Sequence, residues 1–385
     1  MQIKTVAEIN KYTGRSVNPM DFPDQLFELY SVPCFETGYP EIIKGKEIGS
    51  TKITVEEGDV LICKINPRIN RVWVVKHNTE HPLLASSEWI VVRNNEIDSD
   101  YLKCYFSSPT FRTLLTSQVA GIGGSLTRAQ PKQVAKYPVP VPNALEQKRI
   151  SNLLNDVSRL ISLRKEQLAK LDQLVKSRFI ELFVATDAAS DWPYCTIADV
   201  SNDMRTGPFG SALHHDEFVD SGVFVLGIDN AVENKFSYNR MRYITAEKYR
   251  ELKRYTVYPG DVIITIMGTV GRSAVIPADM PKAINTKHLA CITPNAKMVN
   301  AQFLSCAFQV HPDIRAQLQK QCKGAIMDGL NLTIIKGLSF HIPPINLQDR
   351  FVGFYEHVDK SKLTIQQSLD KLEVMKKAMM QEYFG

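Results

Sequence analysis

The sequence predicts an α+β protein made of two globular heads, each followed by a long helix, with the second half repeating the first. Three observations support this fold class: motifs recur about 202 residues apart, β-rich segments alternate with amphipathic ones, and a stretch of about 39 residues at 145–183 lacks proline and glycine. We expect a first head at 1–142, a long helix at 143–189, a second head at 190–343 and a long helix at 344–385.

The repeat is carried by matched motifs at a nearly constant offset. "GDVLIC" at 58–63 returns as "GDVIIT" at 260–265, and "YLKCYF" at 101–106 returns as "FLSCAF" at 303–308. Near the end of each half, "VPVPNALEQKRI" matches "FHIPPINLQDRF", which places Gln147 opposite Gln348. One such match is only a turn before a strand, but a constant offset along a whole half indicates duplication.

Each head contains several strand candidates and one amphipathic helical segment. The strand candidates include "KITVEEGDVLICKI" and "RVWVVKH" in the first head and "GVFVLGI" and "GDVIITIMG" in the second, bounded by turn residues. The helical segments are "DYLKCYFSSPTFRTLL" and "AQFLSCAFQVHPDIRAQLQK". We therefore expect each head to be an α+β domain.

The predicted long helices lie at 143–189 and 344–385. Asn143 with Glu146 has the form of a helix cap, and Asn346 with Asp349 repeats it imperfectly. Alternating steps of four and three residues define an apolar seam on each helix. Its predicted core is Ile150, Leu154, Val157, Ile161, Leu168, Leu171, Val175 and Leu182 on the first helix, and Phe351, Tyr355, Val358, Ile365, Leu369, Leu372, Met379 and Tyr383 on the second.

A narrow seam on so long a helix requires a partner helix, and the other long helix is the nearest candidate. If a pseudo-two-fold axis relates the halves, the helices form an antiparallel coiled coil with Ile150 near Tyr383 and Leu182 near Phe351. Cations interrupt the seam at Arg164, Arg178, Lys362 and Lys376. Either their stems lie along the seam while the charges reach water, or they fix the register or bind another subunit.

Composition excludes several classes of protein. The net charge is +5, and the excess of Lys and Arg in each expected segment is at most two, so a DNA surface would be a local patch. Seven cysteines without a Cys-x-x-Cys pair argue against a disulfide framework and a zinc ribbon. The sequence has neither a membrane-length apolar run nor the apolar stretch of a signal peptide, so we expect a cytoplasmic protein.

Candidate DNA-binding residues lie in loops of both heads. Arg and Lys bind phosphates or guanine edges, and Asn can bridge an adenine edge. In the first head the candidates are Lys64, Asn66, Arg68, Asn70, Arg71 and Arg128; in the second they are Arg205, Arg272, Asn285, Lys287 and Lys323. Each of these loops, taken alone, is explained equally well as a polar or glycine-rich connection between strands that binds no ligand.

The sequence lacks the motifs of the enzymes that act on DNA. "NPRI" at 66–69 has Arg and Ile where an AdoMet-dependent amino-methyltransferase needs Pro and an aromatic residue, and no phosphate-binding loop is present. No cluster has metal-ligand spacing, and His214 with His215 is an isolated pair. We therefore expect no catalytic, cofactor-binding or metal-binding residues, and a chain that is not an enzyme.

Two unlike heads, each followed by a long helix, with repeated "GDV(L/I)I" motifs and proline-rich segments before "LEQKRI", resemble the DNA-specificity subunit of a Type I restriction-modification system. "SRFIELF" at 177–183, echoed by "MQEYF" at 380–384, adds to the resemblance, which covers essentially the whole chain. The second repeat departs from the first where Leu347 replaces Glu146.

The resemblance implies that each head is a target-recognition domain for one half of a split, asymmetric DNA site, while the paired helices set the gap. It also implies two modification subunits that methylate adenine with AdoMet, and restriction subunits that use ATP and Mg²⁺. Those cofactors would belong to the partners, and none is expected on this chain.

Three alternatives remain open at the level of sequence. The runner-up is a specificity subunit of a Type IIB-like system, which serves a fused methylase and nuclease. A coiled-coil scaffold with protein-binding heads would show no sequence-dependent retention of DNA. An unrecognised enzyme would show turnover by the isolated chain.

Overall fold

The computed structural model describes residues 2–117, 119–120, 127–209, 212–322 and 330–385. The chain forms two compact units: the first contains residues 1–165 together with 366–385, and the second contains residues 166–365. Each unit therefore combines one head with segments of both long helices, and each is described by itself below.

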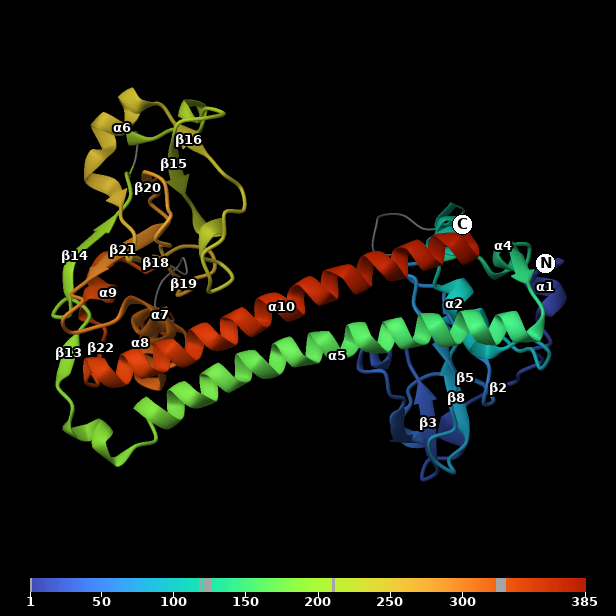
Figure 1. Cartoon of the computed structure of the whole chain (residues 1–385). Helices are drawn as coiled ribbons and strands as arrows, with labels where there is room; N and C mark the ends of the chain where they lie inside the picture. The colour runs from blue at the N-terminus through green and yellow to red at the C-terminus, as the bar shows by residue number, and fades with distance from the viewer. Residues whose placement is uncertain (1, 118, 121–126, 210–211, 323–329) are drawn as a thin grey trace. The chain divides into compact units, whose positions relative to one another are not determined.

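The first head consists of short strands, with its helices concentrated after the ninth strand (Figure 1). Its strands are β1 (Gln2–Thr5), β2 (Ser16–Val17), β3 (Leu26–Tyr30), β4 (Glu41–Lys44), β5 (Lys52–Thr54), β6 (Val60–Cys63), β7 (Val72–Val74), β8 (Leu83–Ser86), β9 (Trp89–Val92), β10 (Val119–Ala120), β11 (Arg128–Ala129) and β12 (Pro138–Val141). Its helices are α1 (Val6–Ile9), α2 (Ser99–Phe106), α3 (Pro109–Ser117) and α4 (Pro131–Val134), and the long helix α5 (Ala144–Phe183) follows.

The second head has a similar succession, with one helix among its strands and the others after its ninth strand. Its strands are β13 (Tyr194–Thr196), β14 (Ser201–Thr206), β15 (Val223–Leu226), β16 (Tyr243–Ile244), β17 (Thr256–Val257), β18 (Val262–Thr265), β19 (Ser273–Val275), β20 (Ala283–Asn285), β21 (Leu289–Pro294) and β22 (Ser339–His341). Its helices are α6 (Ala246–Leu252), α7 (Ala301–Val310), α8 (Pro312–Cys322) and α9 (Leu332–Gly337), and the long helix α10 (Ile345–Phe384) follows.

The sheets of the two heads share one topology. The order β4-β3-β8-β5 in the first head corresponds to β16-β15-β20-β17 in the second, and in each the central pair, β3 with β8 or β15 with β20, is parallel. The order β7-β6-β9 likewise corresponds to β19-β18-β21. The first head adds β2 at one sheet edge, and the second adds β14 at another. The prediction of an α+β fold with an internal repeat is therefore confirmed.

The repeated Gly-Asp-Val motifs form the same buried turn in both heads. Gly58 and Gly260 have left-handed φ angles of 87° and 84°, and the following carboxylates of Asp59 and Asp261 are each 1% exposed. Each carboxylate accepts a hydrogen bond of 2.9 Å from the backbone N–H three residues earlier. The aspartates thus fix the turn that leads into β6 and β18, which explains why the motif recurs in the sequence.

The matched glutamines fasten each long helix to the head before it. Gln147 Oε1 accepts from the backbone N–H of Asp98 at 2.9 Å, and its Nε2 donates to the Pro142 carbonyl at 2.8 Å. Gln348 makes the equivalent bonds to Asn300 and Pro343, at 2.8 and 2.7 Å. Both glutamines are buried, and Asp98 and Asn300 are the N-caps of α2 and α7.

The two long helices begin differently. Asn143 Oδ1 accepts from the Glu146 backbone N–H at 2.9 Å, which is the predicted cap of α5. The equivalent prediction for Asn346 is wrong, because α10 already begins at Ile345, directly after Pro344. Asp349 instead accepts from the side-chain amide of Asn300 at 2.9 Å, so it ties α10 to the start of α7.

The long helices pack antiparallel within each unit, as predicted. In the first unit Arg149 lies over the Tyr383 ring, 5.9 Å from its centroid, and Lys165 pairs with Glu373 at 2.9 Å. In the second unit Lys362 pairs with Asp172, and the ring centroids of Phe183 and Phe351 are 5.5 Å apart. Residue numbers rise on one helix as they fall on the other, which is the register expected from the sequence.

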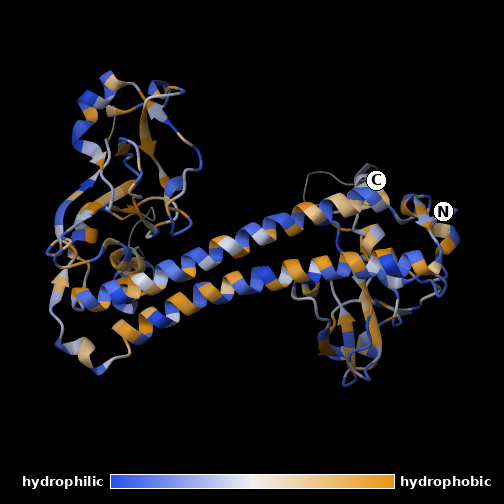
Figure 2. Ribbon diagram, in the orientation of Figure 1, coloured by the Kyte–Doolittle hydropathy of each residue, from blue (hydrophilic) through white to orange (hydrophobic). Residues whose placement is uncertain are grey.

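Apolar side chains recur along both long helices (Figure 2). Every residue of the predicted seam is buried or half-buried. At the C-terminal end of each helix, however, the most buried side chains are shifted by one residue from the seam: Phe179, Phe183, Met380 and Phe384 are each at most 7% exposed. The shift arises because these ends also pack into a head, Phe183 against Phe303 of α7 and Phe384 against Tyr101 of α2.

The four cations of the seam differ in their surroundings. Lys362 and Arg178 form ion pairs with Asp172 and Glu181, so their charges are balanced at the rim of the seam. Lys376 is half-buried, and burial lowers the pKa of its ammonium group. This lysine therefore weakens the apolar contact between the helices in the first unit.

Candidate nucleic-acid interface

The predicted site of the first head is the turn between β6 and β7. Asn66 and Asn70 flank it with left-handed φ angles of 50° and 54°, a conformation that Asn tolerates better than most residues. The Ile69 N–H donates to the Asn66 carbonyl at 2.9 Å, which closes the turn, and the Asn70 side-chain amide donates to the Phe106 carbonyl at 3.0 Å. The two asparagines thus shape the turn and dock it onto α2.

The structure brings the predicted cations of the first head close to this turn. The Lys64 carbonyl accepts from the Ala129 N–H at 2.9 Å, and a β-bridge joins Ile65 to Arg128. Arg68 is exposed at the tip of the turn. Arg128 pairs with Glu88, and Arg71 pairs with Glu36, both at 3.1 Å. A phosphate at this surface would have to compete with two carboxylates for these arginines.

Buried polar atoms without partners mark the same region. Among the described residues, Asn70 Oδ1 and Thr127 Oγ1 are buried and make no hydrogen bond. Thr127 lies next to the Arg128 strand, and its carbonyl accepts from the Asn66 N–H at 3.1 Å. Unsatisfied polar atoms carry an energetic cost, and here they border the loops that the sequence singles out.

The turn between β18 and β19 occupies the corresponding place in the second head. Glycines at 268 and 271, with φ angles of 72° and 80°, take the left-handed positions that asparagines hold in the first head. Arg272 follows this turn and is exposed. The two heads therefore share a backbone shape here and differ in the side chains they present.

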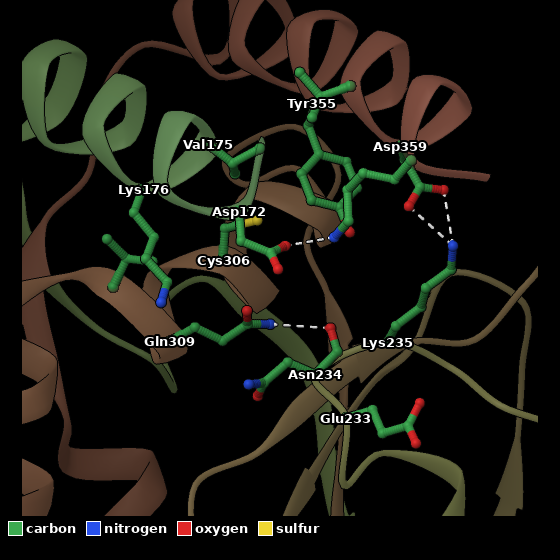
Figure 3. Close-up of a pocket in the computed structure, with 13 residues that line it drawn as sticks. Asp172, Val175, Lys176, Glu233, Asn234, Lys235, Cys306, Gln309, Tyr355 and Asp359 are labelled. Atoms are coloured by element: carbon green, nitrogen blue, oxygen red, sulfur yellow. Dashed lines mark hydrogen bonds and ion pairs between the residues drawn. The ribbon is translucent and has the colours of Figure 1, made fainter. Parts of the chain in front are cut away.

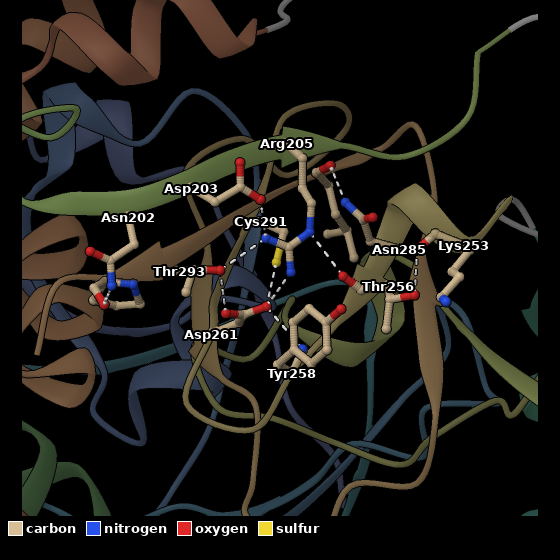
Figure 4. Close-up of polar contacts among 12 residues, drawn as sticks. Asn202, Asp203, Arg205, Lys253, Thr256, Tyr258, Asp261, Asn285, Cys291 and Thr293 are labelled. Carbon is tan, nitrogen blue, oxygen red and sulfur yellow. Dashed lines mark hydrogen bonds and ion pairs between the residues drawn. The ribbon is translucent and has the colours of Figure 1, made fainter.

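Arg205 was predicted to bind DNA, but its contacts place it inside the fold (Figure 4). Its guanidinium donates to the Thr256 carbonyl and the Thr293 hydroxyl, both at 2.9 Å, and to the carboxylates of Asp203 and Asp261. The side chain is 12% exposed. Because Asp261 is buried, Arg205 supplies its counter-charge, and we remove Arg205 from the DNA-contacting set.

The two heads neutralise the buried aspartate of the repeated turn with arginines from different places in the fold. In the first head the partner of Asp59 is Arg93, which binds it with two bonds of 2.7 Å. In the second head the hydroxyl of Thr293 donates to Asp261 at 2.7 Å, and the cation comes from β14. The repeated carboxylate is thus kept while the position of its cation has moved.

Asn285 also belongs to the fold. Its side chain is fully buried, and Nδ2 donates to the Leu289 carbonyl at 3.1 Å. Asn285 Oδ1 and the neighbouring Thr286 Oγ1 have no partner among the described residues. Lys323 lies outside the described residues.

Lys287 lies in a hollow of about 560 Å³ that we call the basic groove. The groove forms where the parallel strands β15 and β20 end, since Gly227–Asp229 and Thr286–His288 follow these strands and both line it. Its cationic or titratable residues are His214, His215, Arg240, Arg242, Lys287 and His288.

Charges within the basic groove are arranged around Asp229, the carboxylate among its described lining residues. Asp229 pairs with Arg242, which fixes the direction of that guanidinium. Burial, with Lys287 and Arg242 nearby, lowers the pKa of His288. The groove therefore attracts anions most strongly through the arginines and Lys287 at neutral pH.

The corresponding strand ends of the first head carry the opposite charge. There a hollow follows β3 and β8, and its lining includes Glu41, Glu47 and Glu88 together with Lys52. The two heads thus present different electrostatic surfaces on one shared frame.

The arginines of the basic groove are not among the residues predicted from the sequence. Arg240 and Arg242 stand in "YNRMRY" at 238–243, a cationic segment beside two tyrosines that could have indicated a nucleic-acid surface. His214 and His215 form an isolated pair in the sequence. In the fold they line the basic groove together with Lys287.

Metal sites and membrane-spanning helices are two further possibilities for the described residues. No group of three or more His, Cys, Asp or Glu side chains in the described part of the chain is arranged to hold a metal ion. Within the same residues, no helix combines the length and the apolar character needed to cross a bilayer.

Comparisons with known proteins agree on one family. Residues 190–374 match the family model of the Type I restriction modification DNA specificity domain. The chain is 20% identical over 352 residues to the MjaVIII Type I restriction enzyme specificity subunit of Methanocaldococcus jannaschii, covering 87% of this chain and 80% of that protein. It is 22% identical over 245 residues to the EcoBI specificity subunit of Escherichia coli, covering 57% of this chain and 51% of that protein.

Solved structures share the fold along the entire chain. One, from work on complex assembly and conformational transition of the type I R-M system, has a TM-score of 0.60 at 16% identity and covers 100% of this chain and 97% of that one. The Type I S subunit from M. genitalium gives 0.58 at 12% identity, with 100% and 96% covered. The family match over residues 190–374 and the shared fold make this chain similar to the specificity subunits of Type I restriction-modification systems.

Proposed function

We propose that this chain is the DNA-reading subunit of a Type I restriction-modification complex, in which each head recognises one half of a bipartite, asymmetric DNA site. The head at 1–142 and the head at 190–343 act as the two target-recognition domains. The helices at 143–189 and 344–385 hold them apart and dock the methyltransferase subunits.

One observation carries this proposal: the heads share a frame and differ at the surfaces where a ligand would bind. Both heads keep the buried aspartate turn and the glutamine fastening. The strand ends, in contrast, carry glutamates in the first head and cations in the second. A duplicated frame with divergent surfaces suits a protein that reads two different half-sites.

The proposed contacts with DNA are made by cations of the two loop regions, some exposed and some, such as Arg71 and Arg242, half-buried. In the first head these are Lys64, Arg68, Arg71 and Arg128, with Asn66 and Asn70 shaping the turn. In the second head they are Arg240, Arg242, Lys287 and Arg272. Cations that reach phosphates supply affinity, and those that reach base edges supply sequence discrimination.

The length of α5 suits a spacer between half-sites. An α-helix of 40 residues is about 60 Å long, while one turn of B-DNA covers about 34 Å. Two heads joined by such helices can contact major grooves that are more than one turn apart. The base pairs between them would remain unread.

Catalysis in this proposal belongs to the partners. Two modification subunits would bring AdoMet and methylate adenine, and restriction subunits would bring ATP and Mg²⁺. The chain described here would contribute recognition and no chemistry of its own.

Methylome sequencing of cells that express the chain with its modification subunits tests the proposal. We expect a bipartite motif, and exchange of residues 190–343 for the second head of another family member should change one half-site only. Deleting four residues from each long helix, at the same level of the antiparallel pair, should change the gap and keep both half-sites. The proposal is wrong if the head exchange alters neither half-site, or if methylation needs no bipartite motif.

A further inference from the structure

Among the described residues, one edge of β7 has no neighbouring strand. β7 is the edge strand of the sheet β7-β6-β9. The Val75 N–H donates to the Asp59 carbonyl, and the Arg71 carbonyl accepts from the Cys63 N–H, so the odd-numbered residues bond toward β6. Antiparallel pairing alternates, and the N–H and C=O groups of Val72 and Val74 therefore point away from β6. The hydrogen bonds of the described residues give these outward groups no partner.

A groove of about 520 Å³ runs along this edge, and we call it the β7 groove. Its aromatic wall is formed by Phe35, Tyr39 and Trp73, with the Phe35 and Trp73 ring centroids 5.7 Å apart. Lys76, from the chain after β7, and Lys103 of α2 also line the groove. The groove thus combines an unpaired backbone edge, an apolar wall, two ammonium groups and the carboxylate of Asp100 on α2.

The second head shows what covers the corresponding edge there. β19 matches β7, since Val275 lies opposite Val262 as Val74 lies opposite Val60. The outward N–H of Ser273 donates to Asn234 Oδ1 at 3.4 Å.

Further bonds hold this covering segment in place. Gln309 Nε2 donates to the carbonyls of both Ser273 and Asn234, each at 3.3 Å. Figure 3 shows Gln309 pointing at Asn234, with the neighbouring Lys235 bound to Asp359 of α10. The second head therefore covers its own edge with the segment 233–235.

We infer that the β7 groove of the first head receives an extended peptide segment of a partner protein, which adds a strand to β7. The segment pairs its main chain with the outward groups of Val72 and Val74. Apolar side chains of the segment pack on the aromatic wall, and carboxylates reach Lys76 and Lys103. A peptide fits this groove better than DNA does, because its wall is apolar and the outward backbone groups of Val72 and Val74, residues only 4% and 8% exposed, offer alternating donors and acceptors.

A proline substitution tests strand addition directly. Val74→Pro removes an outward N–H while keeping the pairing with β6, and proline is tolerated at such edge positions. Val275→Pro is the matched control, because it makes the same change at the equivalent place in β19. The full-length chain and both variants are applied to an array of overlapping 12-residue peptides that cover the modification and restriction subunits encoded with it.

We expect the parent chain to bind at least one segment, Val74→Pro to lose at least tenfold in affinity for it, and Val275→Pro to retain it. If circular dichroism shows that Val74→Pro is misfolded, Lys103→Glu takes its place and should cause a similar loss for an acidic segment. The inference is overturned if no peptide binds, if binding survives both changes, or if duplex DNA rather than peptide protects the Val72 and Val74 amides from hydrogen exchange.

The choice of peptides rests on the proposed function. The strand addition to β7 and the proposed function are contradicted by different experimental results. A chain that retains DNA in a sequence-dependent manner but binds no peptide contradicts the β7 groove alone. A chain that binds a peptide through β7 but shows no DNA selectivity contradicts the proposed function alone.

Discussion

Gln348 links α10 to the N-cap of α7: its Oε1 accepts the backbone N–H of Asn300 at 2.8 Å, and its Nε2 donates to the carbonyls of Met298 and Pro343. The side chain is fully buried. Gln147 makes the equivalent link to Asp98 in the first unit, so each head depends on one amide to orient the helix that leaves it.

Replacing Gln348 with Met should lower the free energy of unfolding by about 2–4 kcal/mol, because buried backbone groups lose their partners while the volume is kept. Gln147→Met should act similarly in the first unit. Urea denaturation followed by circular dichroism measures both. Gln366→Met, at an exposed position of α10, is the control and should change stability by less than about 0.5 kcal/mol. Equal effects of all three changes would contradict a special role for the buried pair.

Arg205→Met should destabilise the second unit by about 3 kcal/mol, because it leaves the buried Asp261 carboxylate without a cation. Thermal and urea unfolding provide the measurement. Arg272→Met, at an exposed position, is expected to leave stability within about 0.5 kcal/mol of the parent. A stable Arg205→Met variant with weakened DNA binding would return Arg205 to the interface.

Lys376→Met should raise the free energy of unfolding by about 1 kcal/mol at pH 7, since a half-buried ammonium is replaced by an apolar side chain of similar length. Burial lowers the pKa of Lys376 in the folded state, so the charged form opposes folding at pH values below that lowered pKa. This destabilising contribution of the ammonium group disappears as the pH rises above 10.5, the ordinary pKa of lysine. The difference between variant and parent should therefore shrink between pH 8 and pH 11. A constant difference across that range would argue against charge burial.

His311→Ser should flatten the acid limb of the stability curve. His311 is buried between the rings of Phe179 and Phe340, and burial lowers its pKa below 6.5 although Asp313 opposes the shift. The unfolded chain therefore binds a proton at a higher pH than the folded chain does. The stability that neutral His311 contributes is complete above pH 6.5 and is lost as the pH falls toward the lower folded-state value.

Serine is the appropriate replacement for His311 because the first head has Ser108 at the equivalent position, where Ser108 Oγ accepts from the Phe111 N–H at 3.1 Å. Unfolding free energies at pH 7.5 and pH 5.5 give the comparison, and groups common to both proteins cancel in the difference. The parent should lose more stability than the variant between these two values. Identical losses would show that another group causes the acid sensitivity.

Arg240→Ala should weaken binding of the cognate DNA several-fold and reduce the slope of log affinity against log salt by about one. Arg240 lines the basic groove and is exposed. Fluorescence anisotropy of the assembled complex at several salt concentrations measures the slope. Lys297→Ala removes an exposed charge outside the groove and should have a smaller effect. If the two variants behave alike, the groove has no privileged role in binding.

The parts of the fold that the sequence predicted well are those with a strong local signal. The offset between the Gly-Asp-Val motifs predicted the repeat, because both copies need the same buried carboxylate and the same left-handed glycine. The seam residues predicted that the long helices pair, and the pseudo-two-fold relation between the halves predicted that they pair antiparallel. At the ends the prediction shifted by one residue, because Phe183 and Phe384 respond to the heads, which the seam pattern does not contain.

The candidate interface was harder to predict, because a cation that binds a ligand and one that neutralises a buried carboxylate look alike in a sequence. Arg205 illustrates this, since its partner Asp261 is 56 residues away and meets it only through strand pairing. The basic groove shows the opposite error, because its arginines were not predicted to bind DNA. They come from segments that meet only when the chain folds, at the ends of β15 and β20. No local pattern joins His214 to Lys287.

The anchoring of Phe384 has a consequence for biosynthesis. Its ring lies 5.8 Å from that of Tyr101, and together with Met380 it belongs to the apolar core that also holds α2 and β6. The first head therefore cannot finish burying that core until the ribosome has released the last turn of α10. Until α10 has been synthesised, Tyr101 and Tyr105 lack their contact with Phe384, so we expect the first head to expose apolar surface at this place.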